Sequence, residues 1–160
     1  MKRKGTIKEY LDYHDKYQEI YGSKAVVLME VGKGAFYEIY AVHNEELGLN
    51  DGPDVYMYGD QLNIQVTRKK KANPIVSYAN ALMVGVPTCA FLKYLNILIE
   101  LGYTVIQVDQ LTEGKNPERD VAEIHSPGTI LDPMKPNDTN HLVSLYISVY
   151  PQRDRKPQIR

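Results

Sequence analysis

The feature that most constrains the fold of this chain is a pair of apolar segments joined by a short glycine-containing turn. AVVLMEV (25–31) and GAFYEIYAV (34–42) both have the composition of β-strands, and Gly32-Lys33-Gly34 lies at their junction. Two strand-like segments with a tight glycine-rich connection are typical of a β-hairpin. We therefore predict a hairpin whose tip is formed by residues 32–34.

The second strand of this hairpin carries an unusual pair of side chains. Because side chains alternate along a strand, one face presents Phe36, Glu38 and Tyr40, and the other presents Tyr37, Ile39 and Ala41. The second set suits a core, whereas the first places an aromatic ring beside a carboxylate. On an accessible face, this pair could stack on a ring and accept a hydrogen bond. The alternative is that Phe36 packs in the core and Glu38 is a solvated edge residue, and the strand alone favours this alternative.

The rest of the chain alternates between helical and strand-like patterns. Apolar residues at helical spacing predict a helix over 6–21, where Thr6 and Glu9 fit a capping box. A second helix is predicted from an N-cap at Thr88 through Leu101. The polar segment 44–53 is expected to be a turn or loop, and an apolar segment covers 81–86. Strands are predicted over 62–67, 103–111 and 121–126. The fold class is therefore α/β, with a mixed β-sheet flanked by helices.

The composition changes near residue 132. DPMKPNDTN, within 132–140, has the composition of a linker, and LVSLYISVY (142–150) has the alternation of a strand. We therefore predict one domain over 1–131, a linker over 132–140, and the first strand of a truncated second domain within 141–160.

The charge and cysteine content limit the classes of function. The net charge is −1, so nucleic-acid contact would have to come from a local patch. The densest positive run is Arg68-Lys69-Lys70-Lys71, which suits either a solvated loop or contact with phosphate. The single cysteine, Cys89, excludes an internal disulfide, and its apolar neighbours predict a buried thiol. The four histidines lack metal-ligand spacing, so no metal site is expected. No apolar run is long enough to cross a membrane, and we expect a soluble intracellular protein, cytoplasmic, nuclear, organellar or viral.

Several short motifs, in order from about residue 6 to 131, resemble the N-terminal mismatch-recognition domain of the MutS family of DNA mismatch-repair proteins. GAFYEIY is similar to the family's GDFYELF, IQVTRK to its LTKR, and MVGVP before a helix to its MAGIP. LGYTVIQVDQ is similar to GxxVAICEQ and SPGTI to TPGT, and LVSLYISVY then looks like the first strand of the family's connector domain. Each motif is weak by itself, whereas five or six in order are specific.

The resemblance implies a function for Phe36 and Glu38. In the family, the Phe of a Phe-x-Glu motif inserts from the minor groove and stacks on the mispaired base, and the Glu accepts a hydrogen bond from that base. The implied partner is double-stranded DNA with mismatches or small loops. Arg68, Lys69, Lys70 and Lys71 would supply sequence-independent phosphate contacts. The resemblance also implies a homodimer in the full-length protein.

The sequence differs from the family's motifs at several positions. Part of the family's activity also belongs to a region outside this chain. The Asp before the family's Phe-Tyr-Glu is Ala35 here, and Thr88 and Cys89 stand where the family has an aromatic residue and a histidine. These differences indicate a divergent branch, viral or organellar. The family's ATPase, with its ATP and magnesium, would lie downstream, so we expect a binding domain with no cofactor and no catalytic residues.

Two alternative hypotheses, each from a different class of function, are open. A small metal-dependent nuclease could use Glu30, Glu38 or Asp109, provided that these carboxylates converge on a hard cation. A protein-interaction module without DNA binding is the third reading, and the presence of both Phe36 and Glu38 speaks against it.

Overall fold

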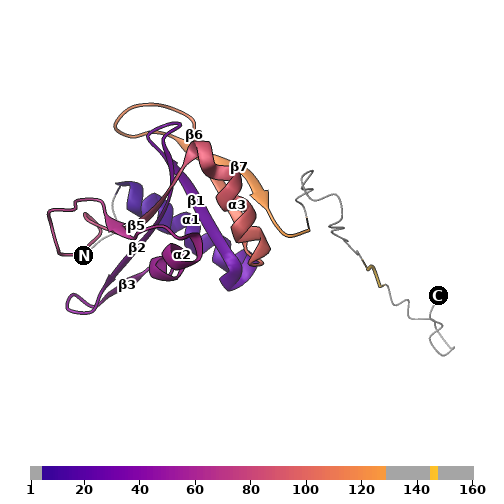
Figure 1. Cartoon of the computed structure of the whole chain (residues 1–160), viewed down its shortest axis with the longest axis horizontal. Helices are drawn as coiled ribbons and strands as arrows, with labels where there is room; N and C mark the ends of the chain where they lie inside the picture. The colour runs from indigo at the N-terminus through magenta and orange to yellow at the C-terminus, as the bar shows by residue number, and fades with distance from the viewer. Residues whose placement is uncertain (1–4, 129–144, 148–160) are drawn as a thin grey trace, which may run out of the picture. The chain divides into compact units, whose positions relative to one another are not determined.

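Figure 1 shows a computed structural model of the chain, which describes residues 5–128 and 145–147. Its elements are, in order, α1 (Gly5–Tyr21), η1 (Gly22–Lys24), β1 (Ala25–Val31), β2 (Phe36–Asn44), β3 (Leu49–Asp51), α2 (Val55–Leu62), β4 (Thr67–Arg68), β5 (Leu82–Pro87), η2 (Thr88–Ala90), α3 (Phe91–Glu100), β6 (Thr104–Gln110) and β7 (Arg119–His125). Residues 145–147 have no regular secondary structure, and the remainder of the predicted strand 142–150 lies outside the described residues.

The strands form one mixed sheet. Its order is β4-β5-β2-β1-β6-β7, and β3 pairs with β2 off this path. β1 and β2 form the predicted antiparallel hairpin, with Val31 opposite Phe36 and Met29 opposite Glu38. β1 and β6 are parallel, and the other pairs are antiparallel. The predicted α/β class with a mixed sheet is therefore confirmed.

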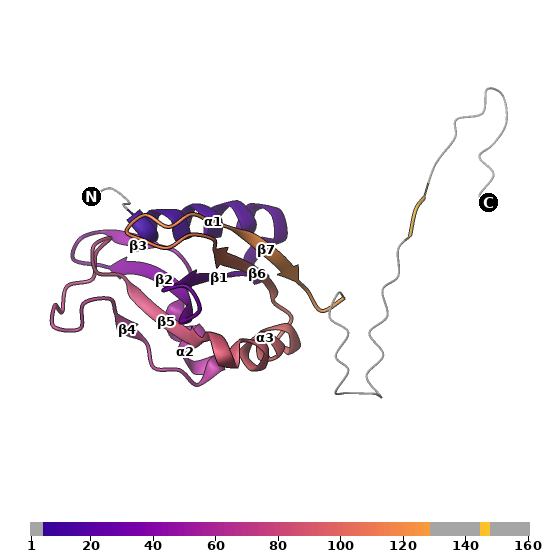
Figure 2. The same cartoon turned by 90° about the horizontal axis from the view of Figure 1, so that it is seen from above.

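Helices cover both faces of the sheet. Figure 2 shows α1 on one face and α2 with α3 on the other. On the first face, the ring of Tyr10 in α1 meets Tyr40 of β2 edge-on, with 5.4 Å between ring centroids. On the second face, the Tyr37 ring lies 4.5 Å from that of Phe91 in α3. Both faces of β2 are therefore buried over most of its length, and its alternating pattern does not separate a wet face from a dry one.

The region before the basic run differs from the prediction. Residues 62–67 were expected to be a strand, but α2 extends to Leu62 and the following strand, β4, comprises only two residues. The helix begins at an N-cap, Asp54, whose carboxylate accepts hydrogen bonds from the amides of Tyr56 and Met57, each 3.1 Å long. The Asp-Gly-Pro sequence of 51–53 signals the turn, and Asp54 directly after it supplies the cap.

Three smaller expectations are also wrong. Thr88 does not cap a helix, because the chain first forms η2 and α3 begins only at Phe91. Cys89 lies in η2 and is exposed rather than buried. Glu9 does not close a capping box with Thr6, since its carboxylate forms an ion pair with Arg119, 2.7 Å away. The domain boundary at 131, the linker 132–140 and nearly all of the segment 141–160 lie outside the described residues.

Within the described ranges, no helix is both long and apolar enough to cross a lipid bilayer.

Candidate nucleic-acid interface

Phe36 is the first residue of β2 and lies directly after the hairpin turn. It pairs with Pro87 of β5, and 45% of its surface is exposed. An exposed ring at the end of a sheet strand contributes little to the core. The structure therefore fits the hypothesis that Phe36 is accessible and not the alternative that it packs in the core.

Glu38 differs from both sequence-based expectations for it. β2 lies between β5 and β1, so Glu38 is not on an edge strand, and only 8% of its surface is exposed. The hydroxyl of Tyr40 donates a hydrogen bond to Oε2 of its carboxylate. Burial raises the pKa of the Glu38 carboxyl, and the Tyr40 hydrogen bond together with the charges of Lys69 and Arg119 lower it in part. Glu38 is therefore a buried and positioned acceptor rather than a solvated one.

Gly85 of β5 lies next to both Phe36 and Glu38. It lies opposite Glu38 in the sheet. A Cβ atom at Gly85 would be 3.8 Å from Cδ1 of Phe36 and 3.9 Å from Cγ of Glu38. The ring and the carboxylate stem therefore border the same small space above this glycine, on one face of the sheet.

Hydrogen bonds donated by backbone amides hold the end of the hairpin in place. The Glu30 carboxylate accepts from the amide of Gly34 in the turn and from the amide of Gln110 in β6, the latter at 2.7 Å. The amide of Thr88 donates to the carbonyl of Ala35 at 3.1 Å. The residue before Phe36 is thus tied to η2, and the turn before it is tied to β6, so Phe36 projects from a fixed backbone.

The basic run divides into one anchored residue and three exposed ones. Arg68 lies in β4, and its guanidinium donates to the carbonyls of Asn73 and Lys71, at 3.0 and 3.5 Å. Arg68 therefore organises its own loop as well as adding charge. Lys69, Lys70 and Lys71 are exposed.

Asn80 shapes the loop that carries the lysines, residues 69–80, which we call the basic loop. The sequence analysis missed this residue. Its side chain is 1% exposed and makes three hydrogen bonds: Oδ1 accepts from the amide of Lys70 at 2.7 Å, and Nδ2 donates to the carbonyls of Asn73 and Ile75 at 2.9 Å each. A lone asparagine before a strand carries no signal of this role, because its three partners become neighbours only when the loop folds back.

The basic loop acts on Glu38 electrostatically, although the loop and Phe36 lie at opposite ends of β5. The charge of Lys69 acts on the Glu38 carboxylate and lowers its pKa. Arg68, directly before the lysines, pairs with Leu82 at the start of β5, whereas Phe36 pairs with Pro87 at its end. We call this set of residues, Phe36, Glu38 and Lys69–Lys71, the probe surface.

The carboxylates of the nuclease reading do not converge. Glu30 lies opposite Tyr37 in the hairpin, and Tyr37 donates to Oδ1 of Asp109 at 2.6 Å. Glu38 lies on the other face of the sheet, where Tyr40 meets α1. In the described part of the chain, no group of three histidine, cysteine or acidic residues could hold a metal ion.

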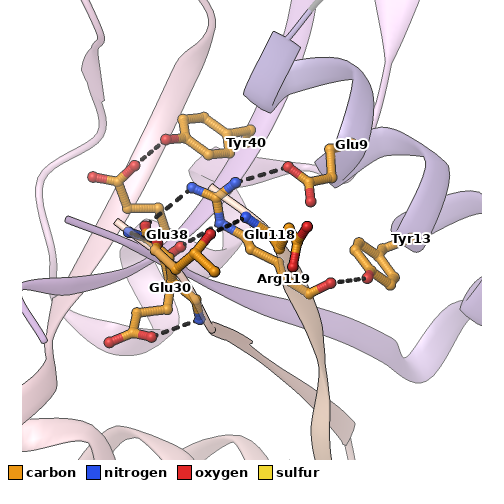
Figure 3. Close-up of polar contacts among 9 residues, drawn as sticks. Glu9, Tyr13, Glu30, Glu38, Tyr40, Glu118 and Arg119 are labelled. Carbon is orange, nitrogen blue, oxygen red and sulfur yellow. Dashed lines mark hydrogen bonds and ion pairs between the residues drawn. The ribbon is translucent and has the colours of Figure 1, made fainter. Parts of the chain in front are cut away.

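Arg119 of β7 is a second residue that the sequence analysis did not single out, and Figure 3 shows its contacts. The Arg119 side chain is 3% exposed. It donates to the carbonyl of Glu30 at 2.8 Å, to the Glu9 carboxylate at 2.7 Å and to Oε1 of Gln110 at 3.2 Å. The Tyr13 hydroxyl donates to the carbonyl of Arg119 at 3.2 Å. One buried guanidinium thus joins α1, β1, β6 and β7 behind the probe surface.

Comparison with known families identifies the fold. Residues 4–134 match the family described as MutS domain I. The chain belongs to the MutS family. The match covers every helix and strand described above, including the hairpin that carries Phe36 and Glu38, and it confirms the family predicted from the ordered motifs.

MutS-family relatives come from a virus and from bacteria. The chain is 32% identical over 144 residues to a mutS homolog of Acanthamoeba polyphaga mimivirus that is named as a DNA mismatch repair protein. This alignment covers 87% of the chain and 12% of the relative. The DNA mismatch repair protein MutS of Streptococcus uberis is 30% identical over 143 residues, which are 86% of the chain and 14% of the relative. The chain therefore spans about an eighth of the length of these relatives.

Proposed function

We propose that this domain recognises mispaired or unpaired bases in duplex DNA, with Phe36 inserting from the minor groove and Glu38 accepting a hydrogen bond from the base. The observation that carries the proposal is the exposed Phe36 ring, held at a fixed strand end beside Glu38. Membership of a family whose relatives are named for DNA mismatch repair supports it.

The physical basis is a difference in the cost of deforming DNA. An apolar wedge in the minor groove unstacks a base step and kinks the duplex, which costs a few kcal/mol per step. A mispaired base is already poorly held, so this cost falls at a mismatch. Stacking on an aromatic ring returns about 1–3 kcal/mol and tolerates any base. The domain would therefore read deformability rather than sequence.

The lysines and the carboxylate would have opposite effects on matched DNA. Lys69, Lys70 and Lys71 would neutralise phosphates on any duplex, which gives affinity without preference. Glu38 is repelled by phosphates unless a base N–H compensates its charge or the carboxyl carries a proton itself. The pair of effects favours a duplex in which a base donor can reach Glu38.

The test compares DNA duplexes by fluorescence anisotropy at low salt. The duplexes carry one G·T mispair or one unpaired T, and each has a matched control. We expect the wild-type chain to bind the mismatched duplex more tightly, and Phe36→Ala to remove about 1–3 kcal/mol of that preference. Leu92→Ala is a suitable control, because Leu92 is another exposed apolar side chain, 71% exposed, outside the probe surface. Equal mismatch preference in Phe36→Ala and wild type would refute the role of Phe36.

The same measurement separates the other readings. Magnesium-dependent cleavage of the duplex would favour the nuclease, and absence of DNA affinity even at low salt would favour the interaction module. We further propose that ATP binding, magnesium binding and homodimer formation belong to the parts of the full-length proteins that this chain does not span.

A further inference from the structure

The contact between Tyr40 and Glu38 is not required by the fold. Tyr40 is 1% exposed, and its ring packs against Tyr10 of α1. A phenylalanine would fill this space equally well, and the family motif quoted above, GDFYELF, has a phenylalanine at this place. The hydroxyl of Tyr40 is an added polar group, and the structure directs it to Oε2 of Glu38 (Figure 3).

The geometry leaves half of the Glu38 carboxylate for another donor. Tyr40 occupies Oε2, and none of the described residues donates a hydrogen bond to Oε1. The stem of Glu38 borders the space over Gly85, next to the Phe36 ring. The buried phenol of Tyr40 thus holds Oε2, and Oε1 is available to a base that stacks on Phe36.

We propose that Tyr40 is a positioning and specificity-determining residue for mismatch recognition, whose hydroxyl holds Glu38 as an ionised acceptor with Oε1 available to a base N–H. This inference rests on the proposed function of the domain. It assigns to Tyr40 the choice between two states of Glu38, because an ionised carboxylate only accepts hydrogen bonds whereas a protonated one also donates.

The charged and titratable groups around Glu38 are consistent with this role. Burial raises the pKa of Glu38, and the groups that oppose this rise are Tyr40 on the same strand, Lys69 on the basic loop and Arg119 on β7. Arg119 itself is paired with Glu9 of α1. The pKa of Tyr40 is raised, first by burial and then by the Glu38 charge, so the phenol keeps its proton and remains the donor.

The consequence is a penalty against matched DNA. An ionised Glu38 near the phosphates weakens binding to any duplex that offers no compensating base N–H. Without the Tyr40 hydroxyl, a larger share of Glu38 would be protonated at a given pH, and the repulsion of matched DNA would weaken.

The experiment uses Tyr40→Phe in the 160-residue chain, with Tyr10→Phe as its matched control. Tyr10 lies in the same core, and its hydroxyl faces the carbonyl of Val27 at 3.5 Å rather than a carboxylate. The first readout is the titration of the Glu38 carboxyl carbon by NMR without DNA, assigned with Glu38→Gln. We expect a higher Glu38 pKa in Tyr40→Phe than in wild type, and a wild-type value in Tyr10→Phe.

The second readout is the ratio of affinities for an unpaired-T duplex and its matched control, measured between pH 5.5 and pH 9. We expect Tyr40→Phe to lower this ratio about 3- to 10-fold near neutral pH, the size expected for one hydrogen bond, and to shift its pH profile upward. In a Glu38→Gln background, Tyr40→Phe should leave the ratio unchanged.

The two readouts separate the possible failures. An unchanged Glu38 pKa in Tyr40→Phe, or an unchanged ratio at every pH in a wild type that prefers the mismatch, overturns the inference and leaves the proposed function standing. A wild type without mismatch preference overturns the proposed function and, with it, the specificity role of Tyr40, even when the Glu38 pKa shifts as expected.

Discussion

At the scale of single residues, the side chains that support the probe are harder to recognise from sequence than the probe itself. The alternation of β2 placed Phe36 and Glu38 on one face, and this is confirmed. It did not reveal that Glu38 is buried, because burial depends on α1 lying over this face of the sheet. It also gave no reason to notice Gly85, whose role comes only from its position opposite Glu38.

The position of Gly85 leads to a prediction about side chains that would fill the space between Phe36 and Glu38. A Cβ atom there would make only ordinary contacts with Phe36 and Glu38, at 3.8 and 3.9 Å, so Gly85→Ala should fold and keep mismatch preference. Gly85→Val is compatible with a strand but fills the space between the two side chains. We expect it to lose about 1–3 kcal/mol of mismatch preference, with matched affinity retained, when both variants are compared by anisotropy. Preserved preference in Gly85→Val would contradict this account of the site.

Burial of Glu38 leads to a prediction about pH and stability. Because the pKa of Glu38 is raised in the folded state above its ordinary value of 4.5, the folded chain holds this proton more tightly than the unfolded chain. The stability due to Glu38 is therefore fully present below about pH 4.5 and is lost as the pH rises through the folded pKa. We expect the free energy of unfolding of Glu38→Gln, relative to that of wild type, to increase as the pH rises from 4.5 to 8, as measured by urea titration. A difference that stays constant over this range would show that Glu38 titrates as in the unfolded chain.

At the scale of elements, long periodic segments were predicted well and the connection between α2 and β4 was not. α1, α3 and the hairpin have clear periodicity, whereas α2 has eight residues and contains Gly59. A glycine inside a short segment is typical of a turn or loop, so the sequence pattern does not predict a helix there. In the structure, a Cβ atom at Gly59 would be 2.9 Å from the carbonyl oxygen of Ile64, so this glycine permits close approach of the chain that leads to the basic loop. That approach depends on tertiary structure and leaves no local signal.

The basic loop should depend on Asn80 as a unit. Asn80→Ala removes three hydrogen bonds from the backbone of residues 70–75 and leaves those groups to find water. We expect weaker binding to mismatched and matched duplexes alike, with a shallower dependence of log affinity on log salt concentration, because fewer phosphates are neutralised at once. Asn116→Ala is the matched control, since Asn116 is an exposed asparagine in the connection between β6 and β7, outside the basic loop. A selective loss of mismatch preference in Asn80→Ala would instead place the loop in base recognition.

At the scale of the whole described domain, Arg119 connects elements that are far apart in the sequence. Sequence patterns identified the strands but not the guanidinium that joins them, because its partners lie 9 to 110 residues away along the chain. Removing one partner of a buried ion pair leaves the other polar groups unsatisfied and can cost about 3–5 kcal/mol. Glu9 is partly exposed, so the cost here should be smaller.

We expect Arg119→Met to destabilise the domain by about 2 kcal/mol in urea denaturation, because methionine fills the space without donating hydrogen bonds. Lys8→Met is the control for loss of a surface ion pair, since Lys8 pairs with Asp12 in an exposed i, i+4 arrangement, and such pairs contribute about 0.3–0.5 kcal/mol. Equal, small losses in both variants would mean that the Arg119 contacts are dispensable.

The exposure of Phe36 also has a consequence for how this domain tolerates change. A residue that contributes little to the core can be replaced without unfolding the chain, so a library of all substitutions at Phe36 should pass a selection for folding almost unchanged. The same library should be strongly depleted at Ile39, three residues along the same strand and fully buried. A descendant of this chain could therefore abandon base stacking in a single mutational step while keeping an intact domain, and the identity of position 36 in such descendants would record selection on activity separately from selection on the fold.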